Sequence, residues 1–105
     1  MFTEEREETT MEVESHNPLQ LKIITPDKTI FDDQVDHVVM PTTDGEVGVY
    51  AHHAPLITKV RKGIIRIHLM DSRLLNLSFD YGLARTRDNA LTILIHGNVK
   101  LTEDN

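Results

Sequence analysis

From Pro18 onward, turn residues divide the sequence into about ten short apolar runs, and this rhythm favours an all-β fold. The runs are Gln20–Ile24, Lys28–Asp33, Val35–Met40, Val47–Tyr50, Ile57–Arg61, Ile64–Leu69, Leu75–Phe79, Leu83–Arg87, Ala90–Ile95 and Val99–Thr102. No window of roughly 11 to 18 residues repeats its apolar positions every 3.6 residues, so the pattern predicts no long helix. We therefore expect a flattened antiparallel β-sandwich of about ten strands.

Two of the intervening turns carry specific hairpin signals. Asp44-Gly45 lies between two apolar runs, and both residue types tolerate the positive φ angles that tight hairpins require. We expect the loop around this pair to extend from Pro41 to Glu46. Asp88-Asn89 predicts a second hairpin between two later runs.

The charge of the chain is concentrated at its beginning. The formal net charge is −6 over 105 residues, and residues 1–17 hold six glutamates against one arginine, a balance of −5. The remaining residues hold 11 acids and 10 bases, a balance of −1. The composition predicts an acidic disordered tail over 1–17, followed by one domain over 18–105. A nearly neutral domain without a basic stripe argues against binding to nucleic acid or to acidic lipid headgroups.

The residues that carry most enzyme chemistry are absent or scattered. There is no cysteine, no Gly-x-Ser-x-Gly nucleophile motif and no glycine-rich phosphate loop. Six histidines are present, but none has the spacing of a zinc-ligand pair. We therefore expect a non-catalytic protein without a cofactor or metal. An alternative is a free-standing β-sandwich with a ligand or metal pocket near His52, His53 and Glu46, and a third possibility is an adaptor that acts through its acidic tail.

The segment from Met40 to Gly63 is the most distinctive part of the sequence. Gly48 inside an apolar run indicates a β-bulge or the close approach of another backbone. Pro55 fixes φ in the loop that follows, which makes that loop stiff and suitable for docking.

This segment resembles the epsilon subunit of the rotary, F-type ATP synthase. The resemblance is carried by Asp44-Gly45-Glu46-Val47-Gly48-Val49 and by His53-Ala54-Pro55-Leu56. Flanking segments that fit the same family are Leu21–Asp27, Ile30–Asp33, Val35–Pro41, Gly63–Ile67 and Asn89–Leu94. The resemblance covers about Leu19 to Thr102 and implies a ten-stranded β-sandwich at the foot of the central stalk, between the gamma subunit and the ring of c subunits.

The resemblance also implies two interfaces on this chain. The gamma-facing residues would be His53, Ala54, Pro55, Leu56 and Thr58. The c-ring-facing residues would be Thr42, Asp44, Gly45 and Glu46. The subunit would be a non-catalytic rotor part that couples gamma to the c ring during ion-driven ATP synthesis. We expect it at the cytoplasmic face of a bacterial inner membrane, held there only through the complex.

Two departures from the family pattern limit what the resemblance implies. Where the family has Gly-Gly-Phe, this sequence has Tyr81-Gly82-Leu83, so position 81 carries a Cβ atom that the family's first glycine lacks. The family also continues into two C-terminal helices that inhibit ATP hydrolysis, whereas this sequence ends at Asn105. We therefore expect no C-terminal helical hairpin and assign neither inhibition nor ATP binding to the chain.

Overall fold

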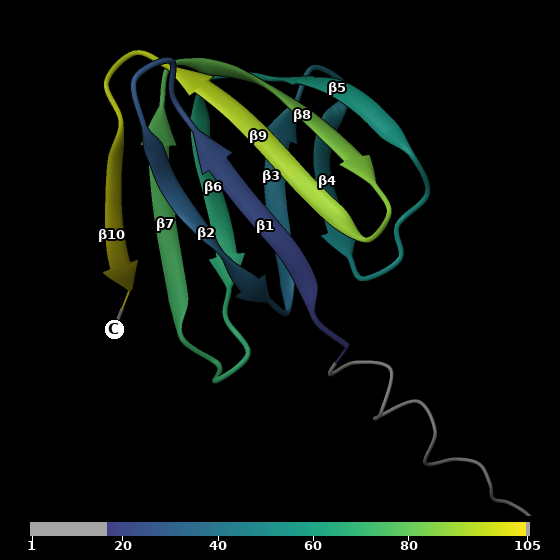
Figure 1. The fold of residues 1–105 in the computed structure, drawn as a ribbon. Helices are drawn as coiled ribbons and strands as arrows, with labels where there is room; N and C mark the ends of the chain where they lie inside the picture. Colours follow the sequence, from purple (N-terminus) through teal and green to yellow (C-terminus); the bar gives the residue numbers. More distant parts are fainter. Residues whose placement is uncertain (1–16, 105) are drawn as a thin grey trace, which may run out of the picture.

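The computed structural model describes residues 17–104, which form ten β-strands and no helix (Figure 1). The strands are β1 (Leu19–Ile24), β2 (Thr29–Val35), β3 (His37–Thr42), β4 (Gly45–Tyr50), β5 (Leu56–Val60), β6 (Gly63–His68), β7 (Leu74–Phe79), β8 (Tyr81–Arg87), β9 (Ala90–His96) and β10 (Lys100–Asp104). All ten predicted strands are confirmed. The predicted tail, apart from Asn17, lies outside the described residues.

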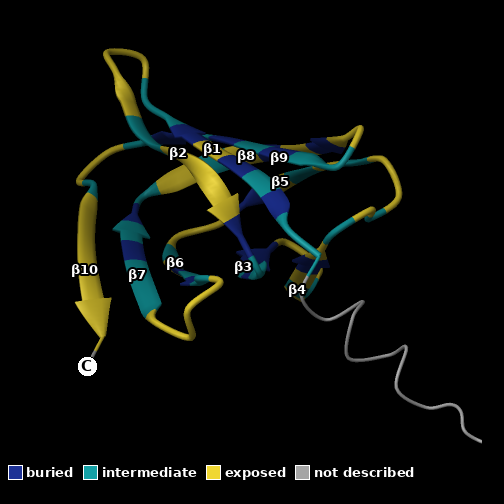
Figure 2. Ribbon diagram, turned by 60° about the horizontal axis from the view of Figure 1, so that its bottom comes forward, coloured by how far each residue is buried: buried dark blue, intermediate teal, exposed yellow. Residues whose placement is uncertain are grey.

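The strands form one curled sheet that folds into two packed layers (Figures 1 and 2). The sheet order is β10-β7-β6-β3-β5-β8-β9-β1-β2, and β4 pairs with the other edge of β3. The sheet turns the corner where β3 meets β5, at the single pair Thr42 and Val60. One layer therefore contains β3, β4, β6, β7 and β10, and the other contains β1, β2, β5, β8 and β9.

One strand pair departs from the predicted antiparallel arrangement. β1 and β9 run parallel, with Gln20 opposite Ala90 and Ile24 opposite Leu94. Parallel neighbours need a long connection, and here most of the domain lies between the two strands in sequence. Local turn signals do not reveal such a pairing, which explains why the sequence predicted a wholly antiparallel sandwich.

The core lies between the two layers and is built by alternation along each strand. Figure 2 shows buried segments in strands of both layers. The burial of β9 alternates strictly, with Leu91, Ile93 and Ile95 buried between partly exposed neighbours. Burying an aliphatic side chain of this size contributes about 1.5–3 kcal/mol, so this inward row is a major part of the driving force for folding.

The two predicted hairpins are present, although the first is tighter than expected. Thr42 pairs with Gly45, so only Thr43 and Asp44 form the turn, and the prediction of a loop from Pro41 to Glu46 is wrong. Gly45 has a φ of 113°, a conformation that favours glycine. The second turn, Asp88-Asn89, has φ angles of 53° and 60°, as a two-residue type I′ hairpin requires.

The glycine inside β4 does not mark a bulge. Gly48 pairs in register with Val39, and an added Cβ atom would lie 3.4 Å from the Tyr50 ring, which is ordinary contact. Close approach of a backbone occurs instead at Gly82, where an added Cβ atom would lie 2.6 Å from the Leu94 carbonyl oxygen.

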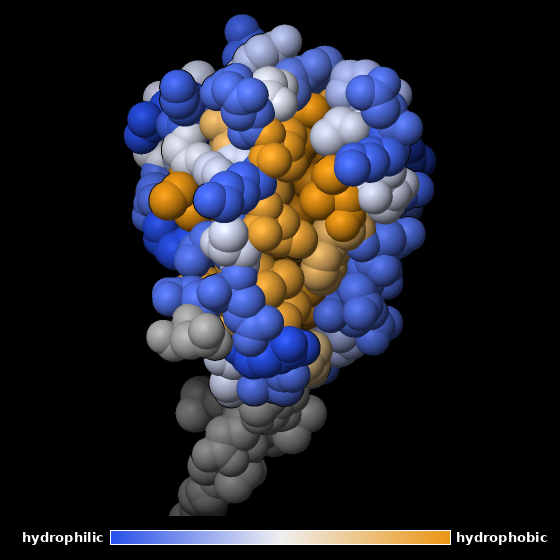
Figure 3. All heavy atoms as spheres, turned by 90° about the vertical axis from the view of Figure 1, so that its left-hand side faces the viewer, coloured by the Kyte–Doolittle hydropathy of each residue, from blue (hydrophilic) through white to orange (hydrophobic). Residues whose placement is uncertain are grey.

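The sandwich is open along the side where its layers end in β2 and β10. Figure 3 views that side and shows a band of apolar side chains between polar margins. A hollow of about 310 Å³ lies there, and its apolar lining includes Phe31, Leu69 and Leu75.

In the described part of the chain, no helix is long and apolar enough to cross a membrane.

Candidate protein-docking surfaces

The hairpin tip, residues Thr42–Glu46, contains the four residues assigned to the c ring from the sequence. Asp44 is exposed, whereas Thr42 is only 1% exposed. The Thr42 hydroxyl donates to the Gly45 carbonyl oxygen at 2.6 Å and accepts from the Asp44 N–H at 3.2 Å. Thr42 therefore braces the tip from inside, and its surface is formed by Thr43, Asp44, Gly45 and Glu46.

Glu46 is held by an arginine on β6, which lies on the other side of β3. The Arg66 guanidinium donates to both Glu46 carboxylate oxygens, at 3.0 and 3.3 Å. This hydrogen bonding, reinforced by the positive charge of Arg66, keeps the pKa of Glu46 below its ordinary value. The sequence gives no sign of this role for Arg66, because only the β3–β4 and β3–β6 pairings bring it beside Glu46.

The hairpin tip is also fastened to the C-terminal end of β5. The Arg61 side chain donates through Nε to the Thr42 carbonyl oxygen at 2.8 Å, and the Arg61 N–H donates to the Pro41 carbonyl oxygen. These bonds join the end of β5 to the tip and reduce its freedom to bend.

The second candidate site is the histidine loop, residues His52–Leu56, which precedes β5. His53 Nδ1 lies 2.8 Å from the Ala54 carbonyl oxygen, and it must carry the proton because a carbonyl only accepts. The buried Thr86 hydroxyl donates to the same carbonyl oxygen at 2.7 Å. The loop is therefore pinned to β8, in agreement with the stiffness predicted from its proline.

Asn89, in the β8–β9 turn, holds three segments together. Its side-chain oxygen accepts from the His52 N–H at 2.8 Å, and its side-chain NH₂ group donates to the Pro18 carbonyl oxygen at 3.1 Å. Its backbone oxygen accepts from the Gln20 N–H. The sequence marked Asn89 only as a turn residue, since nothing local indicates a partner 37 or 71 positions away.

Side chains of β5, the strand that follows the histidine loop, alternate between the inward and the outward side of the layer. Thr58 pairs with buried Ala84, so its side chain lies on the inward side of the layer. Ile57 faces outward and is 69% exposed. Leu56 lies on the same inward side, opposite buried Thr86, so both of these predicted gamma-facing residues are less available to a partner than Ile57, which was missed.

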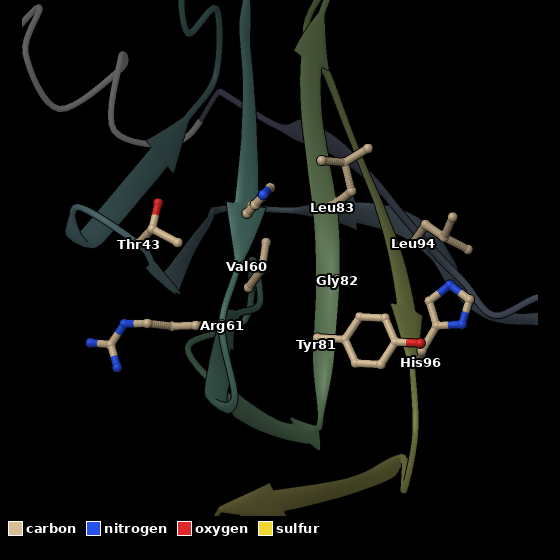
Figure 4. Close-up of a pocket in the computed structure, with 9 residues that line it drawn as sticks. Thr43, Val60, Arg61, Tyr81, Gly82, Leu83, Leu94 and His96 are labelled. Atoms are coloured by element: carbon tan, nitrogen blue, oxygen red, sulfur yellow. The ribbon is translucent and has the colours of Figure 1, made fainter.

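The outward side of this layer carries further exposed apolar groups. Leu83 is 47% exposed and stands directly opposite Leu94, while Tyr81 is 58% exposed. The Tyr81 ring stacks on His96, with centroids 4.9 Å apart and planes 4° apart. These side chains border a surface hollow of about 490 Å³ (Figure 4). The extra Cβ atom at position 81 thus projects outward and is accommodated without disturbing the strand.

The outward side of the other layer is occupied by a stack of three rings. The His37 ring lies 4.4 Å from that of Tyr50 and 4.1 Å from that of His68, with near-parallel planes. The Asp36 carboxylate lies 2.6 Å from His37 Nδ1. Burial lowers the pKa of His68, and the nearby charges of His37 and Arg66 lower it further.

The hairpin tip and the histidine loop lie at opposite ends of β4 (Figure 1). At about 3.3 Å per residue, the strand extends roughly 13 Å from Glu46 to Tyr50, and the histidines lie beyond that end. The alternative pocket built from His52, His53 and Glu46 is therefore not assembled. Residues 17–104 also contain no group of three or more His, Asp or Glu side chains placed to hold a metal ion.

A family model describes the same domain. Residues 18–100 match the ATP synthase delta/epsilon chain, β-sandwich domain. Among curated relatives, the ATP synthase epsilon chain of Prochloron didemni is 40% identical over 80 residues, which is 75% of this chain and 57% of the relative. That of Gloeobacter violaceus is 37% identical over 76 residues, 72% of this chain and 57% of the relative. The chain thus spans somewhat more than half the length of these relatives.

Solved structures agree on the fold. A chain of the Euglena gracilis mitochondrial ATP synthase, from an assembly of OSCP, F1 and c-ring, aligns with a TM-score of 0.73 at 19% identity. That alignment covers 82% of this chain and 53% of the other. A chain of the central stalk and c-ring of the Tetrahymena thermophila enzyme aligns with a TM-score of 0.63 at 12% identity, over 77% and 64% of the two chains. Sequence and fold together place this protein in the ATP synthase delta/epsilon chain family, whose β-sandwich domain it contains.

Proposed function

We propose that this chain is a non-catalytic central-stalk subunit of a rotary ATP synthase, which joins the gamma subunit to the c ring. The observation that carries the proposal is the placement of two braced loops at opposite ends of β4 within an epsilon-type domain. A connector between two moving parts needs separate docking ends and a stiff body between them. A close-packed sandwich provides that stiffness, because its interior resists compression.

The gamma-facing end in this proposal is the histidine loop together with the apolar side chains beside it. Ile57 and Leu83 extend the loop surface along the outward side of β5 and β8. Interfaces depend on a few buried anchors surrounded by contacts that exclude water. We expect Pro55 and Ile57 to provide those anchors, Leu56 to hold the end of the loop against the layer, and His53 to fix the orientation of the loop.

The ring-facing end is the hairpin tip. Its exposed surface is polar, with Asp44 at the turn and Glu46 next to it. Polar and charged contacts of this kind contribute to orientation and to the rate of association more than to raw affinity. The chain would transmit ion-driven rotation to the catalytic subunits without breaking bonds itself. It would lie at a membrane surface as part of the peripheral F1 sector, which for a bacterial enzyme is the cytoplasmic face of the inner membrane.

The test for the gamma end is calorimetric titration of the full chain with the gamma subunit from the same source. We expect one-to-one binding that weakens at least about tenfold in His53→Ala, the loss typical of an interface residue worth more than about 1 kcal/mol. Asn76→Ala is the matched control, since Asn76 lies on the outward side of the opposite layer. No binding by the correctly folded chain would exclude the proposed role.

The test for the ring end uses two paired surface glutamates. Glu46→Lys should weaken association with isolated c ring, while the fold stays intact because Glu46 is half-exposed. Glu103→Lys is the control, because Glu103 also pairs with an arginine, Arg73 at 3.5 Å, but lies on β10. Equal effects of the two substitutions on ring association would count against a specific role for the hairpin tip.

A further inference from the structure

Four of the five strands in one layer have an unusual charge balance. The strands β1, β5, β8 and β9 contain four bases and no aspartate or glutamate, whereas the fifth strand, β2, carries Asp32, which stands opposite Lys22 at the margin of the layer. The bases are Lys22, Lys59, Arg85 and Arg87, and all four are exposed. We name the outward side chains of these four strands the basic face.

Strand register places the bases of this face around its apolar groups. One row across the strands reads Ile57, Arg85, Thr92 and Lys22, and the next reads Lys59, Leu83, Leu94 and Ile24. Strands lie about 4.8 Å apart, so each row extends over roughly 14 Å. Within residues 17–104, no carboxylate forms an ion pair with Lys22, Lys59 or Arg85. The face therefore offers both positive charge and exposed apolar area to something outside the described domain.

The same chain contains a segment of complementary composition. Residues 1–16 hold six glutamates and one arginine, a charge of −5, together with the apolar residues Met1, Phe2, Met11 and Val13. This segment joins the domain at the edge of the basic face. Asn89 holds the Pro18 carbonyl oxygen at 3.1 Å, and the next outward residue, Gln20, stands opposite Ala90, the partner of Arg87.

We propose that residues 1–16 dock on the basic face of their own domain. Their glutamates would pair with Lys22, Lys59 and Arg85, and their apolar side chains would cover the surface around Leu83. The inference goes beyond the proposed function, and it adds a consequence there: a gamma subunit that uses this face would have to displace the segment.

The length of the segment is sufficient for this contact. A chain of sixteen residues spans at most about 55 Å when extended, and a flexible coil of that length would have an end-to-end distance of roughly 22 Å. Both values exceed the extent of a row on the face. A tether of this length would also give an effective concentration on the order of millimolar. Individually weak pairs can therefore be occupied for much of the time.

The experiment uses the full chain without gamma. Because the sequence has no cysteine, Thr9→Cys provides a single attachment point for a nitroxide spin label. Amide signals near the label are broadened in the NMR spectrum. At about 0.01 M salt, where charges act over about 30 Å, we expect broadening of Leu83, Arg85 and Thr92 at least roughly twofold stronger than that of Ile64 and Asn76 on the opposite layer. At about 1 M salt, where charges act over about 3 Å, the difference should disappear.

Two charge variants separate this docking from random contact. Changing all six glutamates of the segment to glutamine should remove the selective broadening without touching the folded domain. Arg85→Glu combined with Lys59→Glu should remove it as well, whereas Lys100→Glu, on β10, should not. Equal broadening of both layers, or selective broadening that persists in the glutamine variant, would overturn the proposal. Neither result depends on gamma binding, so the rotor role and this contact can fail separately.

Discussion

The two outward sides of the sandwich differ in how their polar groups are satisfied. On the layer of β3, β4, β6, β7 and β10, which we name the paired face, Glu46 pairs with Arg66 and the Tyr50, His37 and His68 rings stack. On the basic face, Lys59 and Arg85 have no carboxylate partner within residues 17–104, and Ile57 and Leu83 are exposed beside them. The paired face is thus satisfied by its own side chains, whereas the basic face leaves charged and apolar groups exposed that, in our two proposals, residues 1–16 or the gamma subunit would cover.

The largest expected effect is on the stability of the fold and concerns Asn89, in the β8–β9 turn at the end of the basic face. Asn89→Ala removes the hydrogen bonds to His52 and Pro18, at about 1 kcal/mol each, and places alanine at a φ of 60°, which costs a further 1 kcal/mol or so. We expect a loss of about 3 kcal/mol in the free energy of unfolding. Urea denaturation measures it as a lower midpoint with an unchanged slope.

The control for Asn89 lies on the paired face. Asn76 is an outward residue of β7, and Asn76→Ala should change the free energy of unfolding by less than about 0.5 kcal/mol, as is usual for surface substitutions. Comparable losses in the two variants would mean that the hydrogen bonds of Asn89 contribute no more to the free energy of unfolding than an ordinary surface side chain does.

The next effect separates the faces as docking surfaces through two exposed isoleucines. Ile57, on the basic face, is 69% exposed, and Ile64, on the paired face, is 49% exposed. Ile57→Asp should weaken binding to gamma by about 30-fold, or ~2 kcal/mol, because it places a charge where an apolar anchor is expected. Ile64→Asp should leave that affinity nearly unchanged. The opposite ranking, measured by the same titration, would assign the gamma interface to the paired face.

Much of this architecture could be predicted from short-range patterns. Alternation and turn residues located all ten strands, and Asp88-Asn89 identified its hairpin, because those signals act within a few residues. The hairpin tip was also located, although its turn is shorter than predicted. Long-range pairing could not be predicted in the same way: the parallel contact of β1 with β9 joins segments about 70 residues apart.

The candidate site was only partly predictable for the same reason. Its loops were recognised from sequence motifs, but their bracing by Thr86 and Asn89 arises from pairings distant in sequence. The sequence also did not reveal that Thr58 faces inward and Ile57 outward, because a shift of one residue in the strand register exchanges the two faces. The basic face has no sequence signature, because its four bases are scattered from Lys22 to Arg87.

A moderate effect is expected where the histidine loop is pinned to β8. Thr86→Val keeps the size of a buried side chain but removes the hydroxyl that donates to the Ala54 carbonyl oxygen at 2.7 Å. The expected loss is about 1 kcal/mol in the free energy of unfolding, the usual contribution of one such bond. Affinity for gamma should also fall, because a loosened loop has to be ordered on binding. Unchanged affinity alongside the loss of stability would show that the loop needs no bracing to dock.

The smallest effect tests the paired face through the pKa of His68. This pKa is lowered in the folded protein from an ordinary value of 6.5, chiefly by burial and then by the neighbouring charges of His37 and Arg66, while Asp36 opposes the shift. The unfolded chain therefore takes up a proton first as the pH falls, and the stability contributed by neutral His68 is present above pH 6.5 and lost below it, down to the folded pKa. In His68→Gln the free energy of unfolding should vary less between about pH 7 and about pH 5 than in the unaltered chain. Thr86→Val is the control, since it lowers stability without removing a titratable group and should leave the pH dependence intact. An unchanged pH dependence in His68→Gln would mean that the surroundings of His68 do not disfavour its charged imidazole. It would also contradict the view that the side chains of the paired face are matched to one another.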